Sequence, residues 1–411
     1  MRFVNWYIAR NKITTFKQNF GTMMHTKLTL IVCLCFCTAL FGQQQITEEF
    51  ESDLLQDIRT IQIHLPQGYD KDSLSNYPLT IVLDADYLFD VYVGNAKLFS
   101  YADRAPKQII VGITMAETRE TDTSIDENRQ STLTEESENF IQFIQEELLI
   151  HLEGTYRTSP FLTIVGNGVS ANLLTHFLRD ENPIFNAYLC LNPTFSPDIA
   201  LQMQSYTLNK LRSIDNTYYF YMNEGQFMNN NKKKQIKVLD NYLATLDIQN
   251  LNIKYDVMES SPSTVSTISE AIPRALNEIF EIYSRISPEE YETKIKDLSP
   301  LEAITYLENK YIEIDYLFGI NMGIRTSDII ALEDLIIEKE NGDHLKTFGK
   351  MILNLYPYSP LGHYYLGLYY ESGKNWRRAL QEYRLGYGKM DPADPDADAF
   401  YANVQRMLQK D

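Results

Sequence analysis

The sequence of 411 residues predicts an α/β protein, in which a mostly parallel sheet is covered by helices and followed by an all-helical tail. Two observations predict this fold class. Short apolar runs alternate with segments of helical periodicity up to about residue 285, as is typical of a parallel sheet with crossover helices. From Ser287 onward no strand-like run of comparable quality occurs. We therefore expect a leader at residues 1–42, an α/β domain at 43–285 and a helical domain at 286–411.

The expected strands are short and are flanked by turns or helical patterns. Residues 59–65 alternate between apolar and polar side chains and stop at P-Q-G-Y, which predicts a strand and a turn. The other runs are almost continuously apolar, as expected for strands buried on both faces. They cover residues 79–84, 108–113, 161–165, 187–191, 217–222 and 252–257, and helical spacing marks residues 91–102, 136–152 and 169–178. Right-handed crossovers between these strands then give the mostly parallel sheet.

The leader has the pattern of a secretory signal. Residues 28–42 form an apolar run behind His25 and Lys27 and end in small residues. A membrane span needs about 20 residues, so a cleaved signal is favoured over an anchor, and no stable membrane span is expected after cleavage. Three of the four cysteines lie in this run, which leaves Cys190 as a buried small hydrophobe with no disulfide partner. We expect an exported protein, either periplasmic or extracellular.

The charge balance excludes one class of partner. The net charge is −18, and because residues 1–42 hold five of the 37 Lys and Arg and none of the 55 acidic residues, the remainder carries −23. Such a surface repels nucleic acid and anionic membranes and keeps a protein soluble. We therefore expect no nucleic-acid partner.

The most informative motif is a tight turn at residues 164–171, which read I-V-G-N-G-V-S-A. A predicted strand runs directly into a predicted helix across this turn. α/β-Hydrolases place G-x-S-x-G at such a turn, because the elbow lifts the serine Oγ clear of the sheet and points a backbone N–H at the oxyanion. The frame here is G-N-G-V-S, so Gly168 occupies the nucleophile slot. Glycine has no side chain that can attack a carbonyl.

Several further motifs carry a resemblance to a known family. Residues 59–69 (R-T-I-Q-I-H-L-P-Q-G-Y), 77–86 (Y-P-L-T-I-V-L-D-A-D), 109–113 (I-I-V-G-I) and 140–148 (F-I-Q-F-I-Q-E-E-L) follow in order. Together they resemble the putative-esterase family of α/β-hydrolases, which includes esterase D and ferric-enterobactin esterases. The resemblance covers about residues 55–285. It implies an α/β-hydrolase fold and, for active members, hydrolysis of carboxylic esters.

The resemblance also locates the positions where the catalytic residues should be. Hydrolysis needs a nucleophilic Ser, a His base, an acid that orients the His, and two backbone donors for the oxyanion. In these esterases the elbow is G-H-S-x-G-G, so the Ser slot is Gly168, and the His lies in a segment resembling S-H-S-T-V, where this chain has Pro262. Glu224 is the candidate acid. No histidine lies between residues 177 and 343, so both members of the Ser–His pair are missing.

Three functions remain open at this stage. The leading hypothesis is an exported, non-hydrolytic pseudoenzyme that binds a small-molecule or ester ligand or a protein partner. The alternative is a serine ester hydrolase with a displaced nucleophile such as Ser170 or Ser261. Ser170, however, is rotated about 200° from the elbow direction, and a serine in a first helical turn usually caps or packs. A third hypothesis is an assembly scaffold of the cell envelope.

The elbow predicts a binding nook even without catalysis. The backbone N–H of Val169, with a second N–H near Asp86 or Tyr87, would form an anion-binding site at the helix N-terminus. There is no H-x-x-x-H, C-x-x-C or P-loop spacing, so no metal and no cofactor are expected. The acidic stretch at residues 117–138, which also contains Arg119, is interpreted as a solvated loop.

The tail contains one segment that matches the tetratricopeptide pattern. Within residues 360–392 the small and large packing positions of that repeat are filled by Leu366, Gly367, Tyr370, Ala379, Tyr383 and Gly386, with Pro392 near the closing proline. About three such repeats are needed for independent stability. The segment is therefore either a helical hairpin that packs on its neighbours or a surface that binds a protein partner.

Overall fold

A computed structural model gives the fold of the chain. It describes residues 45–72, 74–126, 128, 131–205, 208–320, 322–391, 394 and 396–410. The predicted leader at residues 1–42 and Pro392 lie outside the described residues.

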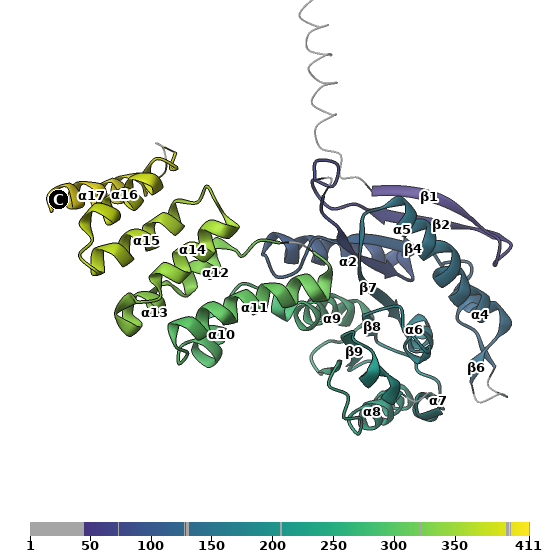
Figure 1. The fold of residues 1–411 in the computed structure, drawn as a ribbon. Helices are drawn as coiled ribbons and strands as arrows, with labels where there is room; N and C mark the ends of the chain where they lie inside the picture. Colours follow the sequence, from purple (N-terminus) through teal and green to yellow (C-terminus); the bar gives the residue numbers. More distant parts are fainter. Residues whose placement is uncertain are drawn as a thin grey trace, which may run out of the picture. The chain divides into compact units, whose positions relative to one another are not determined.

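One eight-stranded sheet forms the centre of the α/β part (Figure 1). Its strands are β1 (Gln45–Ser52), β2 (Asp57–His64), β3 (Tyr77–Val82), β4 (Ile109–Ile113), β7 (Thr158–Asn167), β8 (Ala187–Leu191), β9 (Tyr218–Gly225) and β10 (Leu251–Met258). Their order is β1-β2-β4-β3-β7-β8-β9-β10. β2 runs antiparallel to β4, whereas neighbours from β4 through β3, β7, β8 and β9 to β10 pair in parallel. The mostly parallel sheet is confirmed. The sequence did not predict β1, because its side chains are mostly polar and only partly buried.

Helices cover both faces of this sheet (Figure 1). They are α2 (Ala85–Tyr101), α3 (Arg119–Asp122), α4 (Glu135–Gln142), a π-helical turn (Phe143–Leu148), α5 (Leu149–Thr155), α6 (Val169–Arg179), α7 (Ile199–Ser205), a 3₁₀ turn (Leu208–Ser213), α8 (Asn230–Leu243) and α9 (Thr264–Ile279). The apolar side chains of α2 and α9 belong to one core, whereas those of α4, α5, α6 and α8 belong to the core on the other face. A two-stranded ribbon of β5 (Ile125–Asp126) and β6 (Thr132–Leu133) lies outside the main sheet.

The acidic stretch at residues 117–138 differs from its prediction. Asp122 is only 2% exposed, and both of its carboxylate oxygens accept hydrogen bonds from the Arg59 guanidinium at 2.8 and 2.9 Å. A carboxylate can be buried in this way because a bidentate arginine neutralises and saturates it. The interpretation of the whole stretch as a solvated loop is therefore wrong, since it places the Asp122 carboxylate in the interior.

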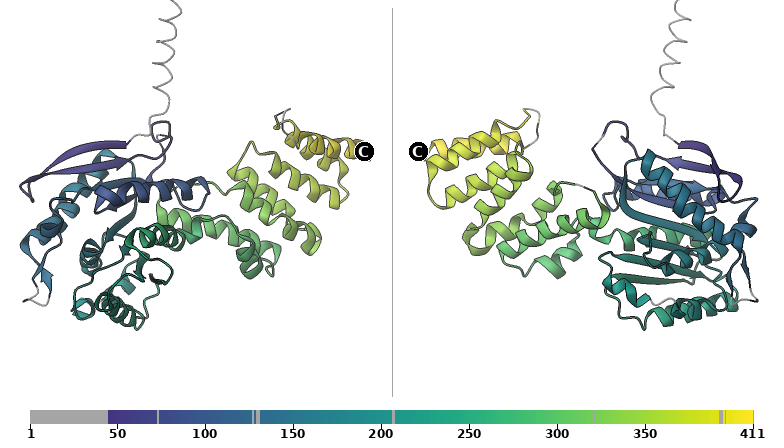
Figure 2. Two further views of the ribbon diagram at one scale, coloured as in Figure 1. Left: turned by 180° about the vertical axis from the view of Figure 1, so that it is seen from behind. Right: turned by 45° about the vertical axis from the view of Figure 1, so that its right-hand side comes forward.

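After α9 the described chain contains helices only (Figure 2). They are a 3₁₀ turn (Glu281–Tyr283), α10 (Pro288–Glu290), a π-helical turn (Tyr291–Ile295), α11 (Pro300–Phe318), α12 (Thr326–Ala331), α13 (Glu333–Glu338), a 3₁₀ turn (Lys339–Gly342), α14 (Leu345–Leu355), α15 (Pro360–Ser372), α16 (Trp376–Tyr387) and α17 (Ala397–Leu408). The expected helical tail is confirmed. The tetratricopeptide-like character of α15 and α16 stays a prediction.

The first helices of the tail share a core with the α/β part. The Phe318 ring of α11 lies 5.0 Å from the Phe161 ring of β7 and 5.2 Å from the Phe280 ring, measured between centroids. All three side chains are buried. The predicted boundary at residue 285 thus falls within a continuous apolar core rather than in an exposed linker.

In the α15–α16 hairpin, Gly367 packs closely against the Tyr383 ring. A Cβ at Gly367 would collide with the Tyr383 ring, which is fully buried, whereas a Cβ at Gly373 would have no neighbour nearer than 3.7 Å. We expect Gly367→Ala to lower the free energy of unfolding by about 1–3 kcal/mol, because overpacking outweighs the better helix propensity of alanine. Gly373→Ala is the matched control and should change stability by less than about 1 kcal/mol. Chemical denaturation of both variants measures the difference, and equal stabilities would contradict the packing argument.

Candidate functional site

The turn between β7 and α6 has the backbone of a nucleophile elbow. Gly168 joins the two elements with φ 68° and ψ −115°. Its N–H donates to the Leu191 carbonyl at 2.9 Å, and its carbonyl accepts the Thr194 N–H at 2.8 Å. Positive φ is strained for a residue with a side chain, and a sharp, strained strand-to-helix turn is where hydrolases hold their serine. The turn therefore has the shape that presents a nucleophile, with glycine in that slot.

A second glycine fixes the frame of this motif. A Cβ at Gly166 would lie 2.9 Å from the backbone carbon and oxygen of Ser170, so the helix approaches the strand too closely for any side chain there. This is the first glycine of the G-x-S-x-G pattern, and its crowding fits a frame centred on Gly168. A frame shifted to Ser170 would not explain it.

Ser170 lies inside the protein and not at the tip of the turn. Its side chain is 0% exposed, and its Oγ donates to Asp84 Oδ2 at 2.5 Å while accepting the Asn167 N–H at 2.8 Å. These bonds tie the start of α6 to the end of β3. The Ser170 hydroxyl thus stabilises the turn through buried hydrogen bonds.

Arg119 lies over the nucleophile slot. Its Nε donates to Asp84 Oδ1 at 2.5 Å, and its Nη2 donates to the Asn167 carbonyl at 2.7 Å. A Cβ on Gly168 would lie 3.4 Å from this Nη2. Partial burial lowers the pKa of Arg119, but the hydrogen bonds and the charge of Asp84 outweigh it and raise the pKa, so the guanidinium is a permanent cation.

Three buried amides line the carboxyl ends of the central strands. Asn192 Nδ2 donates to Asn167 Oδ1 at 3.1 Å, and Asn223 Nδ2 donates to Asn192 Oδ1 at 3.0 Å. At the other end Asn167 Nδ2 donates to the Tyr87 hydroxyl at 3.0 Å. This ladder joins β7, β8 and β9 with groups that neither attack a carbonyl nor take a proton at neutral pH.

The structure places the predicted base slot in the loop before α9 and the predicted acid on β9. Pro262 is exposed just before α9, and the neighbouring Ser261 Oγ donates to Glu270 Oε2 at 2.6 Å. Glu224 is buried on β9, and its Oε2 has no hydrogen-bond partner among the described residues. Because successive residues of a strand face opposite sides, Glu224 points away from the side taken by Asn223.

The predicted oxyanion donors lie in the first turns of two helices, α6 and α2. Val169 opens α6, where first-turn N–H groups have no partner within the helix. The Tyr87 N–H instead donates to the Asp84 carbonyl at 3.2 Å, and the exposed Asp86 accepts the Met115 N–H at 2.7 Å. Burial, followed by the charge of Asp84, raises the pKa of Tyr87, so its hydroxyl is neutral. Tyr87 contacts the elbow through its hydroxyl, which accepts the hydrogen bond from Asn167.

A cavity of about 360 Å³ opens at the elbow. It is lined by Arg119, Asn167, Gly168, Val169, Asn192, Thr194, Phe227, Met228, Asn229, Lys232 and Thr264. This lining includes the predicted Gly168 and Val169 but neither Ser170, Glu224 nor Asp86. It contains no serine, histidine or carboxylate from the part of the chain that the structure describes. Its two charged side chains, Arg119 and Lys232, are both basic.

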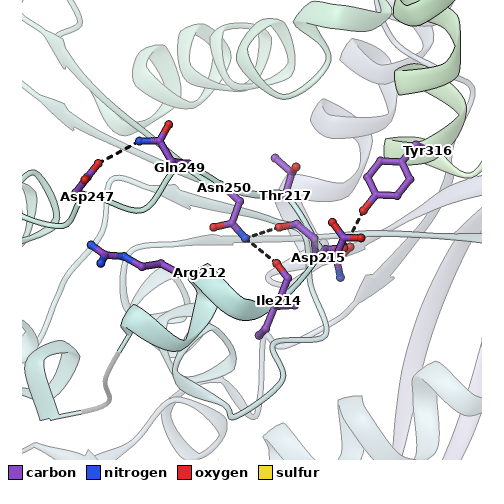
Figure 3. A pocket seen from close by; sticks show the side chains of 9 residues that line it. Arg212, Ile214, Asp215, Thr217, Asp247, Gln249, Asn250 and Tyr316 are labelled. Atoms are coloured by element: carbon purple, nitrogen blue, oxygen red, sulfur yellow. Dashed lines mark hydrogen bonds between the residues drawn. The ribbon is translucent and has the colours of Figure 1, made fainter.

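A second pocket lies at the amino ends of β9 and β10 (Figure 3). Its volume is about 430 Å³, and none of the predicted site residues lines it. Asn250 Nδ2 donates to the carbonyls of Leu211, Ile214 and Asn216 at 2.7–3.0 Å, and the Tyr316 hydroxyl donates to the Asp215 carbonyl at 2.9 Å. These polar groups hold α11 and the loops before the two strands together.

In the described part of the chain, no group of three or more His, Cys, Asp or Glu side chains is placed to hold a metal ion. Among the helices of the same residues, none has the length and apolarity to cross a membrane. Cys190 is buried, as expected for a structural thiol.

Residues 52–190 match the model of the family described as "Putative esterase". This match ends before Glu224 and Pro262, so it includes the nucleophile slot but not the base and acid slots. No curated protein matches the sequence significantly.

Solved structures extend the likeness over most of the chain. An uncharacterised protein from Capnocytophaga ochracea superposes with a TM-score of 0.77 at 22% identity, covering 89% of this chain and all of the other. An IroE-like serine hydrolase from Shewanella oneidensis gives 0.52 at 19% identity, with coverages of 84% and 100%. The BES protein from Bacillus cereus gives 0.51 at 18% identity, with coverages of 58% and 97%. At these identities the likeness establishes the α/β-hydrolase fold alone.

Proposed function

We propose that this chain, in which residues 52–190 belong to the putative-esterase family and form part of an α/β-hydrolase fold, is a ligand-binding protein that does not hydrolyse esters. The observation that carries the proposal is the elbow itself. Gly168 has the backbone of a nucleophile without a nucleophilic side chain. The adjacent cavity, as far as the structure describes it, offers no base to activate either a serine or a water.

The surroundings of the elbow support this reading over a displaced nucleophile. Ser170 is buried and its Oγ bonds to Asp84, so a substrate carbonyl has no path to it. Ser261 is also buried and bonds to Glu270. Both hydroxyls are thus held inside the protein by hydrogen bonds, out of reach of a substrate carbonyl.

Export and partner binding belong to the same proposal. The signal-like residues 28–42 would place the protein in the periplasm or outside the cell. The α15–α16 hairpin would add a protein-binding surface, as its tetratricopeptide-like packing positions suggest. Its close Gly367–Tyr383 approach fits that packing.

The test compares the wild type with a variant in which the missing pair is restored. We expect the wild type to show no turnover of p-nitrophenyl acetate above buffer and no labelling by a fluorophosphonate. Gly168→Ser with Pro262→His supplies a nucleophile and a base, and the Cβ at position 168 has room, since its nearest neighbours lie 3.4 and 3.9 Å away. Gly168→Ser alone is the control that lacks a base.

The outcome that overturns the proposal is specific. Wild-type turnover that is abolished in Ser170→Ala or Ser261→Ala, together with fluorophosphonate labelling of the same serine, would make the protein an esterase. Absence of wild-type turnover supports the binding role whether or not the double variant gains activity, because a restored pair still needs an oxyanion hole.

A further inference from the structure

We propose that the elbow cavity binds a small organic anion, either a carboxylate or a phosphate monoester, through Arg119 and Lys232. This inference rests on the proposed function and specifies the ligand class of that same cavity. Its basis is the charge of the lining, the direction of the helices that begin there, and the apolar side chains on the remaining wall.

The two cations have unused hydrogen-bonding capacity. Arg119 uses Nε and Nη2 to hold Asp84 and the Asn167 carbonyl, and its Nη1 has no bond to any described residue. None of the ion pairs between described residues includes the Lys232 ammonium. Asp84 is 1% exposed and lies behind the guanidinium, so no carboxylate among the described residues faces the cavity.

The charged side chains of the cavity are positive, whereas the net charge of the protein is negative. The chain carries a net charge of −18, with 55 acidic and 37 basic residues, so the charged side chains of a hollow are more often acidic than basic. A cavity of about 360 Å³ with two basic and no acidic side chains among its described lining is therefore a local reversal of charge. Anions are attracted to such a hollow even when the protein as a whole repels them.

Three helices begin at the cavity wall and add to its positive potential. Val169 is the first residue of α6, Thr264 is the first residue of α9, and Asn229 is the N-cap of α8. Helix N-termini carry partial positive charge and free N–H groups, which favour anions. These ends strengthen the site that the two cationic side chains define.

The rest of the lining indicates that the anion is attached to an apolar body. Phe227, Met228 and Val169 supply the apolar side chains of the lining. The volume of about 360 Å³ lies at the small end of the range for ligand sites. An aromatic acid of the size of benzoate would place its anionic group between Arg119 and Lys232 and its ring against the apolar wall.

The experiment measures binding to the full-length mature protein by isothermal titration calorimetry. The probes are benzoate, phenyl phosphate and the neutral benzamide, at two salt concentrations. We expect at least one anion to bind at least tenfold more tightly than benzamide and to weaken as salt rises. The relative affinities of benzoate and phenyl phosphate decide between a carboxylate and a phosphate ligand.

Lys232→Gln tests the site itself. It should weaken binding of the preferred anion by about tenfold, because it removes one charge-assisted contact from a partly buried cavity. Lys234→Gln is the matched control, since it makes the same charge change on α8 at an exposed residue outside the lining, and it should change affinity less than about twofold. Thermal unfolding of both variants checks that they fold equally well.

Each contrary result identifies what is wrong. Benzamide binding as tightly as the anions, no binding of either anion, or equal losses in Lys232→Gln and Lys234→Gln would overturn the anion assignment. Tight binding of a neutral ester without turnover would overturn the ligand class while leaving the non-hydrolytic function standing. Turnover of p-nitrophenyl acetate by the wild type would remove the proposed function, whatever the anions do.

Discussion

Phe318→Ala is expected to lower the free energy of unfolding by about 3–5 kcal/mol, the range for truncating a fully buried phenylalanine. The ring is 0% exposed and contacts Phe161 of β7, Phe280 and Tyr283, with centroids 5.0–6.4 Å apart. Its removal leaves a cavity where the first long tail helix meets the sheet. Urea unfolding followed by circular dichroism measures the loss.

A control on the same helix separates packing from helix propensity. Leu301 lies in the first turn of α11 and is 50% exposed, so Leu301→Ala should cost less than about 1 kcal/mol. If Phe318→Ala were as mild as Leu301→Ala, the tail helix would not share a core with the α/β part. The same contact means that a truncation at residue 285 would uncover buried rings, so loss of a partner in such a variant would not by itself locate a binding surface on the tail.

Asp84→Ala is expected to lower the free energy of unfolding by about 3 kcal/mol. Asp84 is 1% exposed and accepts hydrogen bonds from Arg119 and from the buried Ser170 hydroxyl. Its removal leaves a guanidinium without its counter-charge and a buried hydroxyl without its acceptor. Because the Arg119 side chain is 36% exposed, water compensates part of the loss, which places the expected value at the lower end for a broken buried pair.

The control for Asp84→Ala is a variant of a carboxylate that lies outside the elbow. Asp90 lies on the exposed side of α2, and Asp90→Ala should change stability by less than about 0.5 kcal/mol. Thermal unfolding of the two variants in the same buffer gives the comparison. Equal unfolding temperatures would mean that the Asp84–Arg119 pair contributes nothing to the turn.

Sequence periodicity was sufficient for most of the fold. The parallel strands are buried on both faces, so their apolar runs stand out, and the helices between them carry clear 3.6-residue spacing. The edge strand β1 was not predicted, because its partly exposed side chains give no such apolar run. The elbow was located from two glycines and the strand–helix transition around them, since only a few turn geometries join those elements so closely.

Arg119 shows why the site could not be predicted to the same extent. It lies 48 residues before Asn167 within a stretch rich in carboxylates, where an arginine is expected to face water. Only the three-dimensional course of the chain brings it over Gly168. A single signal was available in the sequence: an Asp that follows an apolar strand, as Asp84 follows β3, needs a cation once it is buried. Lys232 gave no comparable signal.

The positive φ of Gly168 makes glycine the residue with the lowest conformational cost at this turn. In an active hydrolase the serine at this turn bears a conformational cost of about 1–2 kcal/mol, which persists because catalysis depends on it. Glycine adopts the same φ of 68° without that cost. Gly168→Ser would therefore be expected to destabilise the protein by a similar amount. In the proposed binding protein, glycine keeps the elbow backbone unstrained beside the cavity.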